Sequence, residues 1–271
     1  MDPLAPLLDL ADVAPALSQA REAVDAAMRH RALRRNGGQV AAEASLRAAV
    51  ASAALDGSRY ELDDVRAGTI TDPVVQGALR VAEALGGLVD LWPRAPRQVL
   101  AKLHVLAARG VVHDHDLGRL TAGASAGPSA AGAPGAAGSH SAAGSLSAAA
   151  LAERIDGLAG LVAGNETTPP LLLAAIVHAE LLTLRPFAGP SGVVARAAAR
   201  LTLINRGFDP RGLVVVEIGH LSREPEYVGS SGAYATGTPD GVRSWLRHYA
   251  AAITAGAGEI TAIGDGVLAA V

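Results

Sequence analysis

The sequence predicts an all-α fold, and three features support that class. Half of the 271 residues are hydrophobic, but alanine supplies much of this fraction and only 3% of the residues are aromatic. A core of this composition has to be built from leucine, valine, isoleucine and alanine packed between helices. Apolar residues recur at helical spacing along most of the chain, and strand-type runs are nearly absent apart from residues 213–218.

Capping residues set the expected helix boundaries. Asn36-Gly37-Gly38 is expected to end a first helix, Asp72-Pro73 to start another, and Thr168-Pro169 to start a third. The helices are expected at about residues 14–35, 39–55, 62–66, 72–89, 95–109, 148–162, 168–185 and 190–207, followed after Thr238-Pro239 by a final helix with a break near residues 256–258.

The domain organisation is expected to be a central domain with two additions. Residues 1–38 are assigned to an N-terminal helical extension, 39–255 to the main domain, and 256–271 to a C-terminal helical tail. Residues 121–148 are almost all Ala, Gly, Ser, Thr and Pro. Such a segment buries too little apolar surface to order itself, so a flexible low-complexity loop is predicted there.

Charge and composition exclude several classes of function. The net charge of −3 and the pI near 6.2 give no support for a nucleic-acid partner. Because there is no cysteine, disulfides, thiolate metal sites and a cysteine nucleophile are excluded. The acidic first 30 residues do not suit a secretory signal, and no run of 18 apolar residues indicates a membrane span, so a cytoplasmic protein is expected. Lys102 is the only lysine beside many arginines, which is typical of a GC-rich bacterial genome.

The most informative stretch runs from His178 to Gly207 and predicts a helix, a tight loop and a second helix. A glycine-containing loop that opens into a helix is an anion site, because the N–H groups of the loop and of the first helical turn point the same way. The candidate anion- or nucleotide-binding residues are Arg185, Gly189, Ser191, Gly192 and Arg196. The alternative is a tight turn between two core helices that binds nothing.

This stretch resembles the motif of the Fic (Fido) family, H-P-F-x-[DE]-G-N-G-R-x-x-R. Four residues match it, namely Pro186, Phe187, Gly192 and Arg196, and His178 begins a similar lead-in helix. Five positions depart from it. Arg185 stands at the position of the catalytic histidine, Gly189 at that of the metal-holding acid, and Pro190, Ser191 and Val193 replace the glycine, asparagine and first arginine. The resemblance implies a Fic-type helical domain with helices 168–184 and 190–207 packed in its centre.

A second resemblance lies at the end of helix 39–55. Ser52, Asp56 and Gly57 resemble the family's inhibitory motif, [ST]-x-x-x-E-[GN], with aspartate in place of glutamate. In the family this helix lies over the active site, and its acid pairs with the last arginine of the core motif. The resemblance therefore implies that Asp56 faces Arg196. The alternative is that Ser52 and Asp56 are ordinary residues at a helix end.

Other parts of the chain also resemble the family. Leu103-His104 is similar to its "LH" position, and we expect His104 to be a packed histidine rather than a ligand. Tyr227 and the segment 241–249, with Trp245, are similar to the closing helices that pack behind the core. The predicted loop at 121–148 takes the place of the family's flap, the β-hairpin that aligns the target peptide.

The departures bear on the chemistry that the resemblance implies, which is transfer of AMP from ATP to a protein hydroxyl. Arg185 has no acceptor and stays protonated, so it cannot act as the general base. Gly189 offers no oxygen ligand, so Mg²⁺ is not expected and no metal site is assigned. ATP or another nucleotide remains possible as a ligand, and no cofactor is assigned.

Three hypotheses follow. The first is a catalytically impaired Fic-like protein, a pseudoenzyme, that binds a protein partner or a nucleotide or phosphate anion. The second is an active nucleotidyl- or phosphoryl-transferase with altered catalytic residues. The third is a helical scaffold without a ligand.

Overall fold

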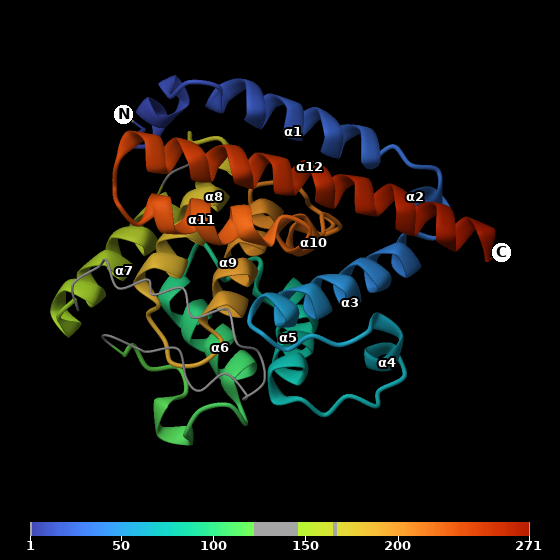
Figure 1. The fold of residues 1–271 in the computed structure, drawn as a ribbon, viewed down its shortest axis with the longest axis horizontal. Coiled ribbons are helices and arrows are strands. Elements are labelled where there is room, and N and C mark those ends of the chain that lie inside the picture. Colours follow the sequence, from blue (N-terminus) through green and yellow to red (C-terminus); the bar gives the residue numbers. More distant parts are fainter. Residues whose placement is uncertain (1, 122–145, 165–166, 271) are drawn as a thin grey trace.

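The fold is entirely helical in the part of the chain that the structure describes. The computed structural model describes residues 2–121, 146–164 and 167–270, and these ranges contain twelve α-helices and three short 3₁₀ helices but no β-strand (Figure 1). The all-α class is therefore confirmed. None of the helices within these ranges is long and apolar enough to cross a membrane.

The helices have the following bounds. The α-helices are α1 (Val13–Ala27), α2 (Ala32–Arg35), α3 (Gly37–Leu55), α4 (Leu62–Arg66), α5 (Pro73–Ala84), α6 (Pro96–Ala108), α7 (Ala148–Gly164), α8 (Pro170–Leu184), α9 (Ser191–Asn205), α10 (Val216–Leu221), α11 (Glu224–Tyr234) and α12 (Pro239–Ala269). The 3₁₀ helices are Ala5–Asp9, Gly86–Leu88 and Asp114–Asp116.

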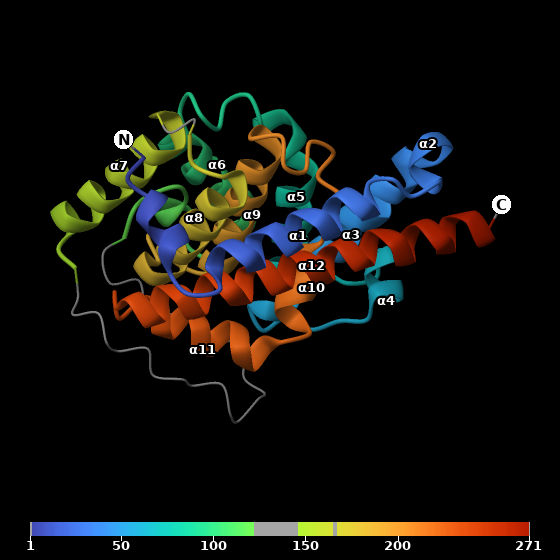
Figure 2. The same cartoon turned by 90° about the horizontal axis from the view of Figure 1, so that it is seen from above.

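Helices α8 and α9 form the centre of the molecule, as predicted. Helix α8 is buried nearly all round, which its sequence explains, because it is apolar on every face from Leu171 to Leu184 except at His178 and near Glu180 and Thr183. Its most extensive contact is with α9, and α3, α5, α6, α7, α11 and α12 surround the two helices (Figures 1 and 2).

Helix α12 covers one side of this centre and packs along α1 in both views (Figures 1 and 2). It is continuous from Pro239 to Ala269, so the break predicted near residues 256–258 is wrong. Gly256 is buried, and a Cβ there would lie 2.8 Å from the backbone of Val215. This glycine therefore serves close packing against the segment before α10 and does not end the helix. The proposed domain boundary at 255/256 falls inside α12.

The first predicted helix is also corrected. The chain turns between Ala27 and Ala32, where the N–H of Ala32 donates to Nδ1 of His30. The glycines that were expected to end this helix instead begin α3. A glycine that ends a helix usually has a positive φ, and neither Gly37 nor Gly38 has one.

Three smaller features of the structure also differ from the sequence-based predictions. Helix α8 begins one residue later than expected, with Pro170 rather than Pro169 at its first position, and the Thr168 hydroxyl donates to Asp2 Oδ1 (2.6 Å) instead of capping the helix. Residues 213–215 form no strand and no other regular secondary structure, and α10 follows them. Helix α5 keeps its predicted cap, Asp72, but ends at Ala84 rather than near residue 89. Residues 122–145 of the predicted loop lie outside the described residues.

Candidate functional site

The candidate site begins where α8 ends. Arg185 is the C-cap of α8 and has left-handed backbone angles (φ 43°, ψ 58°), which are unfavourable for a residue with a side chain. Pro186 follows and prevents the helix from continuing. The side chain of Arg185 is exposed and forms no ion pair or hydrogen bond with any residue in the described ranges. It remains available to an anion near the loop.

His104 holds the loop after Arg185 in place. Its ring stacks on Phe187, with centroids 4.7 Å apart. The N–H of Gly118 donates to its Nδ1 (2.9 Å), so Nε2 carries the proton and donates to the carbonyl of Ala188 (2.8 Å). Burial lowers the pKa of His104, which favours this neutral form. Both nitrogens are used within the protein, so the expectation of a packed histidine is confirmed.

The backbone conformation at position 189 requires a glycine. Its φ is +74°, and a Cβ at this position would lie 2.8 Å from the Val112 side chain. A side chain here would be both strained and crowded. The position that resembles the family's metal-holding acid therefore has no room for one in this packing.

The first turn of helix α9 offers a hydrogen-bond donor to a carboxylate. Pro190 precedes it, and Ser191 is buried with an Oγ that has no hydrogen-bond partner in the described part of the protein. The N–H of Val193, in the first turn, donates to Asp56 Oδ2 (3.1 Å). A carboxylate thus binds at the N-terminus of the helix, where both the free N–H groups and the helix dipole favour negative charge.

Arg196 binds the same carboxylate from the next turn of α9. Its Nη2 donates to Asp56 Oδ1 (2.9 Å) and to the carbonyl of Ser52 (2.8 Å), and its Nε donates to Ser52 Oγ (2.9 Å). The fourth bond runs from Nη1 to the hydroxyl of Tyr227 (3.3 Å). The side chain of Arg196 is 1% exposed and that of Asp56 is 16% exposed. We call Ser52, Asp56 and Arg196 the clamp.

The clamp keeps Arg196 charged. Burial lowers the pKa of Arg196, but the negative charge of Asp56 and the oxygen of Tyr227 outweigh burial and raise this pKa above its usual value. Behind the clamp, His178 lies within 3.0 Å of the Tyr227 hydroxyl. Burial, followed by the nearby positive charge of Arg196, holds the pKa of His178 well below its usual value. His178 is therefore neutral, and one positive charge is balanced by one carboxylate.

Two glycines make the clamp possible. Gly57 has φ +98° and ends α3 directly after Asp56. A Cβ on Gly192 would overlap Asp56 Oδ1 and lie 2.8 Å from Arg196 Nη1. Gly192 therefore allows the carboxylate to approach the start of α9.

The structure brings four of the eight residues singled out in the sequence into direct contact, namely Ser52, Asp56, Gly192 and Arg196, and places Gly57 at the end of the helix that carries two of them. Arg185 and Gly189 lie in the adjoining loop and Ser191 begins α9, and among the described residues none of the three forms a hydrogen bond or ion pair with the carboxylate. The sequence did not indicate two further partners, the N–H of Val193 and the hydroxyl of Tyr227. A backbone donor leaves no signal in the sequence, and Tyr227 is indicated by the sequence only as a packing residue.

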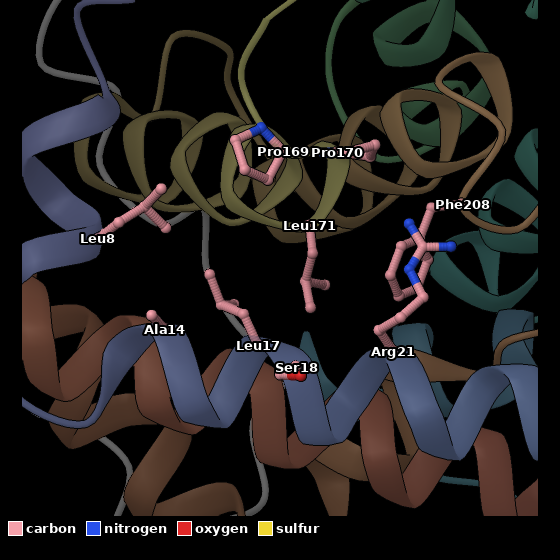
Figure 3. A pocket seen from close by; sticks show the side chains of 9 residues that line it. All are labelled: Leu8, Ala14, Leu17, Ser18, Arg21, Pro169, Pro170, Leu171 and Phe208. Atoms are coloured by element: carbon pink, nitrogen blue, oxygen red, sulfur yellow. The ribbon is translucent and has the colours of Figure 1, made fainter.

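A separate pocket of about 240 Å³ lies between α1 and the start of α8 (Figure 3). Its lining is mostly apolar. Its one cation, Arg21, stacks on Phe208 (4.1 Å) and lies 4.0 Å from Asp25. It adjoins the start of α8, whereas the loop of the candidate site follows the end of that helix, about 20 Å further along its axis. It is therefore not part of the candidate site.

Solved structures resemble this arrangement of helices. A Fic family protein from Desulfovibrio desulfuricans G20 matches with a TM-score of 0.67 at 20% identity, over 92% of this chain and 74% of that one. Fic-1 from C. elegans matches with a TM-score of 0.66 at 17% identity, over 96% of this chain and 73% of its own, and a variant of Fic-1 matches with 0.68 at 18% identity.

This chain has the Fic-type fold. The fold expectation drawn from the core motif is thus confirmed. No protein-family model and no curated protein matches the sequence. At identities of 17% to 20% the likeness concerns the fold, and function has to be argued from the residues of the site.

Proposed function

We propose that this Fic-type protein binds a phosphate group, either free or within a nucleotide, at the N-terminus of α9, and that it does not transfer AMP. The observation that carries the proposal is the position of the Asp56 carboxylate, which accepts from both the N–H of Val193 and the guanidinium of Arg196. Two donors from successive turns of one helix converge on a single anionic group. Such donors suit phosphate oxygens equally well.

The absence of AMP transfer is supported by the groups around the loop. Arg185 cannot accept a proton, and the nearby histidines, His104 and His178, are buried and hydrogen-bonded within the protein. Gly189 supplies no oxygen ligand, both oxygens of Asp56 are engaged, and the described residues contain no cluster of three possible metal ligands. The residues of the loop therefore do not fit Mg²⁺.

The test is incubation with α-labelled ATP and Mg²⁺, alone and with lysate proteins. We expect no labelling by the wild type, by Asp56→Ala or by Arg185→His. The Arg185→His variant is expected to fail because it restores a general base but not a metal ligand, which position 189 still lacks. Labelling by the wild type that Arg196→Met abolishes would overturn the proposal and favour an active transferase with altered residues.

A further inference from the structure

A second buried ion pair lies next to the clamp and is incompletely hydrogen-bonded. Arg200, one turn after Arg196 on α9, has its Nη1 3.8 Å from Glu217 Oε1 on α10, and the two side chains are 7% and 3% exposed. Arg200 Nη2 donates to the carbonyl of Gly212 (2.9 Å). Burial raises the pKa of Glu217, and the charge of Arg200 opposes that rise.

Three hydrogen-bonding groups in this region are not satisfied by any residue that the structure describes. Within the described ranges, Arg200 Nε is a buried donor without an acceptor, and Glu217 Oε2 is a buried acceptor without a donor. Ser52 Oγ accepts from Arg196 Nε, but its own proton is donated to no group in the described part of the chain. Leaving such groups unsatisfied in the interior is destabilising.

These three residues line one small crevice between α3, α5, α9 and α10. Its volume is about 20 Å³, and the rest of its lining is apolar, including Ala49, Ala78 and Val193. A volume of about 10 to 15 Å³ is enough for one water molecule.

We propose that this crevice is a binding site for a single structural water molecule. The water accepts from Arg200 Nε and from the Ser52 hydroxyl, and it donates to Glu217 Oε2. Water fits the three groups better than an ion does, because a cation would be repelled by the two arginines and an anion by Glu217. About three hydrogen bonds is also the usual number for a buried water.

The site goes beyond the proposed anion binding and acts on the clamp through Ser52. When the Ser52 hydroxyl donates its proton to the water, the lone pairs of Ser52 Oγ are directed towards Arg196 Nε. The pair formed by Arg200 and Glu217 thereby helps to position the guanidinium that binds Asp56, although neither residue contacts the carboxylate.

A high-resolution crystal structure of the wild type tests the site directly. We expect one ordered peak within hydrogen-bond distance of both Arg200 Nε and Glu217 Oε2. A crevice without a peak, or an Arg200 side chain that donates from Nε directly to Glu217, would overturn the proposal.

A double-mutant cycle tests it in solution. Ala78→Val fills the crevice, so in the wild type it displaces the water, leaves its polar partners unsatisfied and lowers the Tm by about 2 to 6 °C. In an Arg200→Met/Glu217→Met background the lining is apolar, and the same substitution is expected to lower the Tm by less or to raise it. The helix-propensity cost of valine is the same in both backgrounds, so a difference between the two Tm shifts reports on the polar groups of the crevice. Equal Tm shifts in the two backgrounds would therefore contradict the proposal. If the double variant does not fold, the crystal structure decides.

Discussion

Asp56→Ala is expected to lower the free energy of unfolding by about 3 kcal/mol, the lower end of the range for breaking a buried ion pair. Arg196 is almost fully buried and would lose the one carboxylate that it pairs with among the described residues, while Ser52 and Tyr227 would still accept from it. Because Asp56 itself is partly exposed, the loss is not expected to exceed this value.

The same substitution is expected to create sensitivity to anions. Without the carboxylate, the Val193 N–H and the Arg196 guanidinium have lost their anionic partner, and the space left by the partly exposed Asp56 side chain gives an anion access to them, so phosphate, ADP or ATP should stabilise the variant. A ligand at about 100 times its Kd contributes about 2.7 kcal/mol, which would recover most of the loss. The wild type is expected to respond less, because its own carboxylate competes for the site.

Denaturant unfolding with and without added phosphate or nucleotide measures both effects. Asp63→Ala is the matched control, since Asp63 is an aspartate with a 90% exposed side chain that pairs with Arg66 at the surface. It is expected to cost less than about 1 kcal/mol and to bring no response to nucleotide. An Asp56→Ala variant as stable as the wild type and indifferent to nucleotide would show that the clamp does not hold an anion site.

The clamp shows how much of a site could be predicted from this sequence. Spacing alone did not connect Asp56 with Arg196, because the two are 140 residues apart. The pairing was predicted through two short resemblances, each degenerate when taken alone. The contribution of Tyr227 could not be predicted in the same way, because a hydrogen bond from a helix to a distant hydroxyl leaves no local pattern.

The wrong predictions of helix boundaries have a common physical origin, because they rest on residues that have more than one structural use. Glycine can end a helix, start one or permit close packing, and the sequence does not distinguish Gly37 or Gly256 from a helix-ending glycine such as Gly57. Tandem prolines likewise allow α8 to begin at either position. The apolar periodicity that predicts the helices themselves is redundant over many residues and is therefore more robust.

Gly192→Ala is expected to break the clamp without removing any charge. The added methyl group would overlap Asp56 Oδ1 and crowd Arg196 Nη1, and Arg196 cannot withdraw because its other donors are held by Ser52 and Tyr227. The carboxylate has to move away from the start of α9 and lose its bond to Val193. We expect a loss of about 2 to 3 kcal/mol, within the range for overpacking a well-ordered interior.

Comparison with two other variants separates this mechanism from a general cost of adding a methyl group to a helix. Gly258→Ala in α12 meets no atom within 4 Å and is exposed, so it should be neutral or stabilising by up to about 1 kcal/mol. In an Asp56→Ala background the atom that Gly192→Ala displaces is gone, and the second substitution should cost clearly less than it does alone. If the two losses simply add, Gly192 is needed for something other than the approach of Asp56.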